Sequence, residues 1–180
     1  MALAAVTSAL VLVSTYTFRI PIPATQGYFN LGDIMIFISA FTFGPVVGGV
    51  AGGVGSAIAD ILAGPIFAPF TLIIKGFEGY VAGYVARRGF RGREGAAWLL
   101  ASVVMVGGYF IAESFLIALF FGATEFTGFA AALGEVPFNL LQVFAGGAVG
   151  LPLSRILKNR LPAVVLPARW LGAGMPEKKS

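Results

Sequence analysis

Seven polar or ionisable side chains interrupt the long apolar stretches of this chain, and their types define the chemistry available to it. Carboxylates, an ammonium group and side-chain amides can bind the polar edge of a small molecule or carry out acid–base steps. Such groups are costly in apolar surroundings unless they are paired, so each one indicates a structural or functional partner. The seven are Asp33, Asp60, Lys75, Glu78, Glu113, Asn139 and Gln142.

Several kinds of chemistry are missing from the sequence. The 180 residues include no cysteine and no histidine, which removes thiol nucleophiles, imidazole bases, disulfides and nearly every zinc or haem site. There is no G-x-S-x-G motif and no phosphate-binding G-x-x-x-x-G-K-[ST] loop, so any ATP must be hydrolysed by a partner. We therefore expect no metal, no cofactor and no enzymatic activity. The enzymatic alternative is an intramembrane site that uses Asp33 and Asp60 as paired carboxylates.

Composition places the chain in a membrane. It is 58% hydrophobic and only 11% charged, with a mean hydropathy of +0.90. Soluble domains carry about 25% charged residues, and a water-exposed surface could not be covered with so few. The net charge of +4 comes from basic residues grouped between apolar runs, which is typical of cytoplasmic loops rather than of a nucleic-acid-binding surface.

The apolar runs predict an all-α protein with six transmembrane helices, because a spanning helix needs about 20 mostly apolar residues. Gly44 and Pro45 interrupt the run 31–63, which favours two short helices there. One tilted helix in that run would leave five, and hydropathy does not distinguish the two. The predicted helices are 1–18, 31–43, 45–63, 66–86, 95–121 and 136–154.

The basic residues predict the orientation. Ten of the twelve lie either between the fourth and fifth helices or after the sixth. Both places should be cytoplasmic, which puts both termini inside and the loops 19–30, 64–65 and 122–135 outside. Residues 1–24 have no basic start, so a cleaved signal peptide is not expected. We expect one six-helix domain, 1–157, and a basic cytoplasmic tail, 158–180.

Under this topology most of the buried polar residues fall in the outer half of the membrane, and they predict one polar pocket closed below by apolar packing. Glu113 has no cation within one turn of its helix and is the first candidate for binding. Tyr28, Phe29, Tyr109 and Phe110 can supply aromatic faces for a flat ring. The predicted binding residues are Glu113, Glu78, Lys75, Asn139, Gln142, Tyr109, Asp33 and Tyr28.

Each polar residue also has a structural interpretation. Asn30 can cap the helix that contains Asp33, and Lys75 and Glu78 can neutralise each other. Asn139 and Gln142 can join helices. Asp60 ends its helix, where a carboxylate is disfavoured, and should need a cationic or donor partner.

Small residues form a second pattern. They recur every four residues from Gly44 to Ser56, which predicts close packing between helices inside the protein. Ala5 and Ala9 form a similar pair on the first helix, where an external partner is plausible; Ala4 and Ser8 offer the neighbouring register.

The stretches GYFNLGDIMIFISAFTFGPVVGGVAGGVGSAIADILAG, APFTLIIKGFEGYVAGYV and EVPFNLLQVFAGGAVG resemble the riboflavin-type S components of energy-coupling factor (ECF) transporters. The resemblance covers about residues 5–157. It implies six helices in a prokaryotic cell membrane, vitamin binding near the outer face and a gate between the first two helices. It also implies a complex with a transmembrane coupling subunit and two ATPases, in which Ala5 and Ala9 match the motif that contacts the coupling subunit.

The ligand stays open at this point, because related members handle riboflavin, pyridoxine-like compounds and pyrimidine precursors of thiamine. We expect a small heteroaromatic vitamin or precursor. The alternative functions are a small membrane channel, a structural membrane protein or, less favoured, the carboxylate enzyme.

Overall fold

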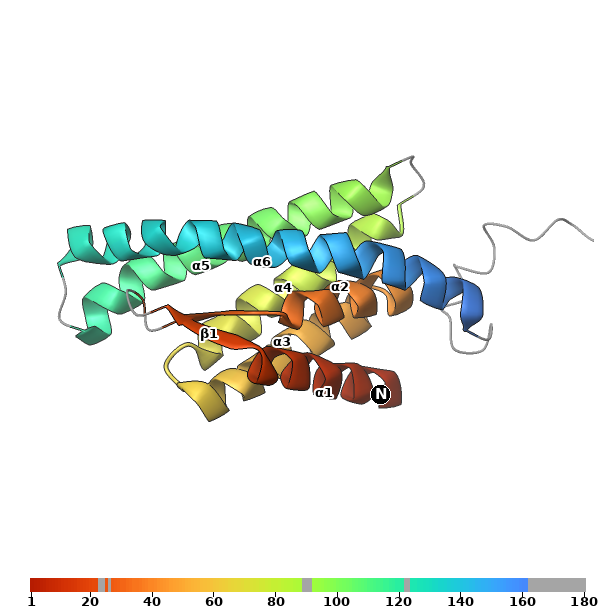
Figure 1. The fold of residues 1–180 in the computed structure, drawn as a ribbon, viewed down its shortest axis with the longest axis horizontal. Coiled ribbons are helices and arrows are strands. Elements are labelled where there is room, and N and C mark those ends of the chain that lie inside the picture. The colour runs from red at the N-terminus through yellow and green to blue at the C-terminus, as the bar shows by residue number, and fades with distance from the viewer. Residues whose placement is uncertain (23–24, 26, 89–91, 122–123, 162–180) are drawn as a thin grey trace, which may run out of the picture.

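The computed structural model describes residues 1–161 except 23–24, 26, 89–91 and 122–123. Six helices run roughly along one axis (Figure 1): α1 (Ala2–Thr17), α2 (Gly32–Phe43), α3 (Pro45–Ala63), α4 (Ala68–Ala86), α5 (Arg93–Phe121) and α6 (Glu125–Arg160). The six-helix prediction is therefore confirmed. The break between α2 and α3 has the expected cause, because Gly44 has a φ of 93° and Pro45 begins α3. Most of the predicted tail lies outside the described residues.

A short antiparallel hairpin, absent from the prediction, joins α1 to α2. It pairs β1 (Arg19–Ile22) with β2 (Gly27–Asn30), and Arg19 lies opposite Asn30. Ile20, Ile22, Tyr28 and Phe29 belong to the β-branched and aromatic types that favour strands. The segment predicted as an outer loop thus contains two paired strands, and β2 carries Tyr28 to the helices.

The predicted start of the last helix is wrong. The segment 122–135 was expected to be a loop, but α6 already begins at Glu125, where the Thr124 hydroxyl accepts a hydrogen bond from the Thr127 amide at 3.3 Å. Residues 129–133 are helix formers, and the helix continues through Pro137. Glu135, Asn139 and Gln142 therefore lie on one face of a continuous helix, at spacings of four and three residues.

Glycines bring α3 and α4 into backbone contact, as the small-residue pattern predicted. A Cβ atom on Gly48 would lie 2.7 Å from the carbonyl oxygen of Gly79, and one on Gly53 would lie 2.7 Å from that of Leu72. Both positions are too close for a side chain. The same pattern lets α1 pack on α3, where a Cβ on Gly55 would lie 2.6 Å from the Ser8 carbonyl oxygen.

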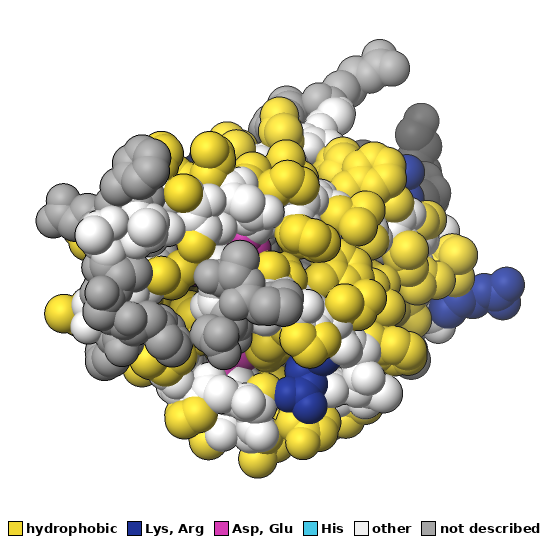
Figure 2. Space-filling view, turned by 60° about the vertical axis from the view of Figure 1, so that its left-hand side comes forward, with side chains coloured by type: hydrophobic (Ala, Val, Ile, Leu, Met, Phe, Trp, Pro, Cys, Tyr) yellow, Lys and Arg dark blue, Asp and Glu magenta, His cyan; other side chains and the backbone are white. Residues whose placement is uncertain are grey.

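Apolar packing fills one half of the bundle. Phe37 and Phe41 of α2 stack with ring centroids 5.6 Å apart, among alanines of α4 and α5. Among the described residues, three helical segments are long and apolar enough to span a membrane, namely Pro45–Ala63, Arg93–Ile117 and Thr127–Arg160. Large side chains such as Leu99, Phe115 and Phe144 are exposed. Hydrophobic side chains cover much of the face in Figure 2, where acidic groups show only in small patches.

Candidate functional site

A polar cavity lies at the end of the bundle where the hairpin meets the helices. The space inside it and at its mouth, where it opens to solvent, amounts to about 440 Å³. Phe67, Met105 and Tyr109 give it apolar and aromatic walls. Six of the eight predicted binding residues lie in its wall: Tyr28, Lys75, Tyr109, Glu113, Asn139 and Gln142. The apolar cluster described above closes the opposite half of the bundle, as the sequence predicted.

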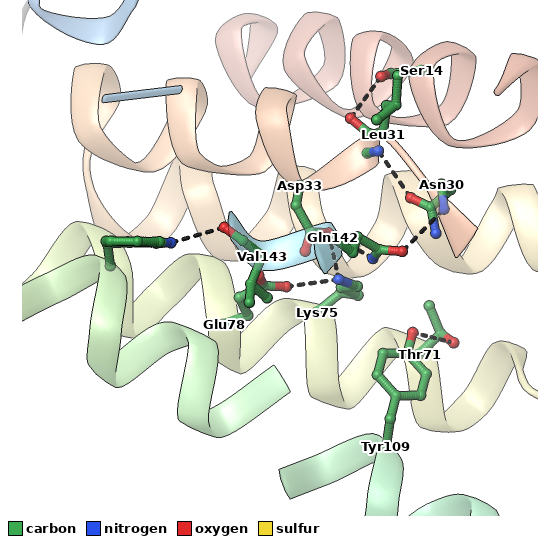
Figure 3. Close-up of polar contacts among 12 residues, drawn as sticks. Ser14, Asn30, Leu31, Asp33, Thr71, Lys75, Glu78, Tyr109, Gln142 and Val143 are labelled. Atoms are coloured by element: carbon green, nitrogen blue, oxygen red, sulfur yellow. Dashed lines mark hydrogen bonds and ion pairs between the residues drawn. The ribbon is translucent and has the colours of Figure 1, made fainter. Parts of the chain in front are cut away.

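The other two predicted residues, Asp33 and Glu78, lie behind the wall and hold Lys75. The Lys75 ammonium bonds to Asp33 and lies 3.0 Å from the Glu78 carboxylate, and all three side chains are almost completely buried. Lys75 and Glu78 thus form the pair considered from their spacing, with Asp33 as an unforeseen second anion (Figure 3). Binding roles for Asp33 and Glu78 stay a prediction.

Gln142 joins this ionic group to the hairpin. Its amide nitrogen donates to Asp33 Oδ1 at 3.1 Å, and its amide oxygen accepts from the backbone N–H of Asn30 at 3.0 Å. Asn30 Oδ1 in turn accepts from the Gly32 N–H at the start of α2, at 2.8 Å. Figure 3 shows this chain of bonds running from the hairpin to Lys75. Asn30 therefore satisfies a free backbone N–H of α2, as predicted, although it precedes the cap position.

Asp60 has a hydrogen-bond donor as its partner, as we expected for a carboxylate at the end of a helix. The Tyr28 hydroxyl of the hairpin donates to Asp60 at the end of α3. Burial and the nearby Asp60 carboxylate both raise the pKa of Tyr28, so its hydroxyl stays protonated and remains a donor. Asp33 and Asp60 are bonded to different partners, so the structure does not join them as a catalytic pair.

The far wall of the cavity is built from α5 and α6. In this wall the side chains of Glu113 and Glu135 are in hydrogen-bond contact with each other. The Thr25 hydroxyl of the hairpin also donates to Glu135. Two buried polar atoms of this wall have no hydrogen-bond partner in the described structure: Glu113 Oε2 and Asn139 Nδ2. An acceptor and a donor are thus both available to a molecule in the cavity.

Glu135 is the main cavity residue that the sequence analysis missed. It was assigned to an outer loop, whereas α6 carries it into the wall. Its spacing to Asn139 and Gln142 matches one helical face and could have revealed it. Thr71, which shares a 2.9 Å hydrogen bond with the Tyr109 hydroxyl, was also missed, because threonine is common in apolar helices (Figure 3).

The two pairs of small residues on α1, Ala5/Ala9 and Ala4/Ser8, lie on different sides of the helix. Ala5 and Ala9 are exposed, whereas Ser8 is buried, with its hydroxyl 3.4 Å from the Val50 carbonyl oxygen of α3. The Ala4/Ser8 register is therefore used inside the protein. The Ala5/Ala9 register is open on the outside of the bundle.

Residues 1–159 match the family described as ECF-type riboflavin transporter, S component. The chain belongs to this family. A protein of Pyrococcus woesei described as an uncharacterized protein in gap 3'region is 42% identical over 156 residues, which are 86% of this chain and 99% of that protein. The thiamine precursor transporter HmpT of Lactococcus lactis subsp. cremoris is 30% identical over 161 residues, which are 88% and 87% of the two chains.

The fold agrees with this membership. The solved S component of a bacterial ECF transporter superposes with a TM-score of 0.70 at 21% identity, over 88% of this chain and 94% of that one. Members of the family are transporter components in a membrane and not enzymes. The carboxylate-enzyme alternative is therefore wrong.

Proposed function

We propose that this chain is the substrate-binding S component of an ECF-type importer, which captures a small heteroaromatic vitamin or vitamin precursor for ATP-driven uptake. One observation carries the proposal: a polar cavity offers the unpartnered Glu113 Oε2 and Asn139 Nδ2 beside the aromatic side chains of Phe67 and Tyr109. Aromatic walls suit a flat ring, and polar atoms at the edges suit its heteroatoms.

The cavity should open to the outside of a prokaryotic plasma membrane. The opposite end of the bundle carries basic residues, among them Arg87, Arg88, Arg155 and Lys158, and such residues favour the cytoplasmic side. At that end Glu94 of α5 holds Arg155 and Lys158 of α6 at 2.7 and 2.8 Å. The substrate would therefore bind on the side from which a cell imports it.

Energy for uptake must come from other subunits, because the sequence contains no phosphate-binding loop. We infer a complex with a transmembrane coupling subunit and two ATPases. The exposed Ala5 and Ala9 on α1 suit this contact, because small side chains let a partner helix approach closely within lipid.

The test combines uptake, ligand binding and co-purification. Ala5→Leu and Ala9→Leu should each abolish uptake and release the ATPases, while the isolated protein keeps its ligand affinity, because the cavity lies elsewhere. Ala130→Leu, the same substitution at an exposed position of α6, is the matched control and should leave all three measurements unchanged. Normal uptake by both α1 variants would place the contact on another face. Absence of ATPases with the unaltered protein would instead favour a channel.

A further inference from the structure

We propose that the cavity selects a small heteroaromatic ring that is neutral or cationic and bears an amino group, and that it excludes anionic forms of the same ring. This inference rests on the proposed function and narrows its substrate class. Its basis is the charge around the cavity together with two of the buried wall atoms that lack partners, one on Glu113 and one on Asn139.

Carboxyl groups greatly outnumber cations around the cavity. Asp60, Glu113 and Glu135 lie in its wall, and Asp33 and Glu78 lie directly behind it. Among the described residues that line the cavity, Lys75 is the only cation, and its ammonium is already held by Asp33 and Glu78. Two carboxyl groups in contact, such as Glu113 and Glu135, can share one proton, and five carboxyl groups in all surround the cavity against the single ammonium.

Arg19, another described cation at this end of the bundle, lies outside the cavity wall. The Arg19 guanidinium sits 4.0 Å from the ring centroid of Tyr16 and 5.7 Å from that of Tyr28. It therefore lies against aromatic rings of α1 and the hairpin and does not line the cavity. A bound phosphate or carboxylate would face Glu113 and Glu135, while the one ammonium in the wall, that of Lys75, is already held by Asp33 and Glu78.

The unpartnered atoms indicate what the ligand should offer. Glu113 is 2% exposed and Asn139 is 7% exposed, so water does not readily satisfy either side chain. Glu113 Oε2 is an acceptor and needs a donor, which an amino group supplies. Asn139 Nδ2 is a donor and needs an acceptor, which a ring nitrogen or a hydroxyl oxygen supplies. An amino-substituted nitrogen heterocycle offers both on adjacent atoms.

Discrimination against anions follows from the carboxyl groups of Glu113 and Glu135. Like charges brought together at a desolvated site weaken binding strongly. We expect the anionic form of a ring to bind at least about a hundredfold more weakly than its amine or neutral form.

The experiment measures the affinity of the purified full-length protein for matched pairs of probes by isothermal titration calorimetry. The pairs are pyridoxamine with 4-pyridoxic acid, 4-amino-5-hydroxymethyl-2-methylpyrimidine with its 5-carboxylic acid, and riboflavin with its 5'-phosphate. For any pair that binds, the uncharged or cationic member should bind at least about a hundredfold more tightly, and an amine-bearing ring should bind most tightly of the three.

Glu113→Gln tests the role of the carboxylate, because it keeps the shape and removes the charge. The affinity for the amine should fall about tenfold or more, the gap between amine and acid should narrow, and the melting temperature without ligand should hardly change. Glu94→Gln, on the same helix at the opposite end, is the matched control. It should change neither the affinity for the amine nor the affinity for the acid.

The outcomes separate the two proposals. If an acid or phosphate binds as tightly as its partner, the charge selection is wrong while the proposed function stands. The same holds if Glu113→Gln lowers the melting temperature but keeps the affinity, because Glu113 would then be structural. If no member of any pair binds, the vitamin-binding function itself fails, and this inference fails with it.

Discussion

Lys75 lies where α2, α4 and the cavity meet, and its ammonium is almost completely buried between two carboxylates. Burying a single charge in apolar surroundings is very costly, and it is tolerated only when the partners are well placed. Asp33 contributes from α2 and Glu78 from the next turn of α4. The group therefore fixes α2 against α4 at the floor of the cavity.

Lys75→Met should be strongly destabilising, because the variant keeps the volume but leaves two buried carboxylates without their cation. We expect a loss of about 3–5 kcal/mol in the free energy of unfolding, measured by reversible denaturation in detergent. Lys158→Met is the control, because it removes an ion pair at the end of the bundle and should cost about 1 kcal/mol or less. Equal losses of unfolding free energy in the two variants would show that the buried ionic group stabilises the fold no more than the ion pair at the end of the bundle does.

Individual site residues were predictable where charge type alone was informative. Lys75, Glu113, Asn139 and Gln142 stand out because polar groups are rare in apolar helices, and all four line the cavity. Spacing along one helix could not show that Lys75 has a second anion, since Asp33 is 42 residues away in the chain. Nor could it show that Glu113 faces Glu135, which depends on how α5 and α6 pack.

The hairpin lines the cavity, and among its described residues three hydrogen bonds tie it to α3 and α6. Tyr28 bonds to Asp60 of α3, Thr25 to Glu135 of α6, and the Asn30 backbone to Gln142 of α6. Gly27 passes so close to Glu135 that a Cβ atom there would lie 2.7 Å from its carboxylate oxygen. We expect a ligand that enters at the hairpin end to pass these contacts, so their strength should affect the rates of binding.

Tyr28→Phe removes one of the three bonds and leaves Asp60 without its tyrosine donor. A hydrogen bond to a charged group is worth about 1.5–3 kcal/mol, so ligand dissociation should speed up by about tenfold or more. Stopped-flow measurement of ligand release tests this. Tyr80→Phe, on the exposed side of α4, should leave the rate unchanged. An unaltered rate in Tyr28→Phe would mean that the hairpin does not limit exit.

The elements were predictable where local signals were strong. Apolar length and the Gly44–Pro45 break were enough for six helices. The hairpin escaped prediction because its strands have four residues each, too few for a clear alternation of polar and apolar residues. The start of α6 was missed because the charge-free run begins only after Glu135, whereas Thr124 provides the actual cap.

At the scale of the whole molecule, the two ends of the bundle differ in charge and in shape. The tips of α5 and α6 project beyond the other helices at the end that carries the hairpin (Figure 1). The 36 residues of α6 correspond to about 54 Å, longer than the hydrocarbon core of a bilayer, which is about 30 Å thick. The helix should therefore extend into the aqueous phase at one or both ends.

Cysteine labelling in whole cells tests the orientation, since the native chain contains no cysteine. Gly95→Cys and Thr127→Cys lie at exposed positions near opposite ends of the bundle. A membrane-impermeant maleimide should label Thr127→Cys from outside and reach Gly95→Cys only after the cells are opened, because basic residues favour the cytoplasm. The reverse pattern would invert the topology and place the cavity inside the cell.

The contacts of α2 also have a consequence for how the protein is made. With 12 residues, α2 is about 18 Å long and too short to cross the bilayer core by itself. Its Asp33 bonds to Lys75 of α4 and to Gln142, which lies 109 residues later in α6. We therefore expect Asp33 to gain its full set of partners only after α6 has been made, so that α2 takes its final place late in the assembly of the bundle.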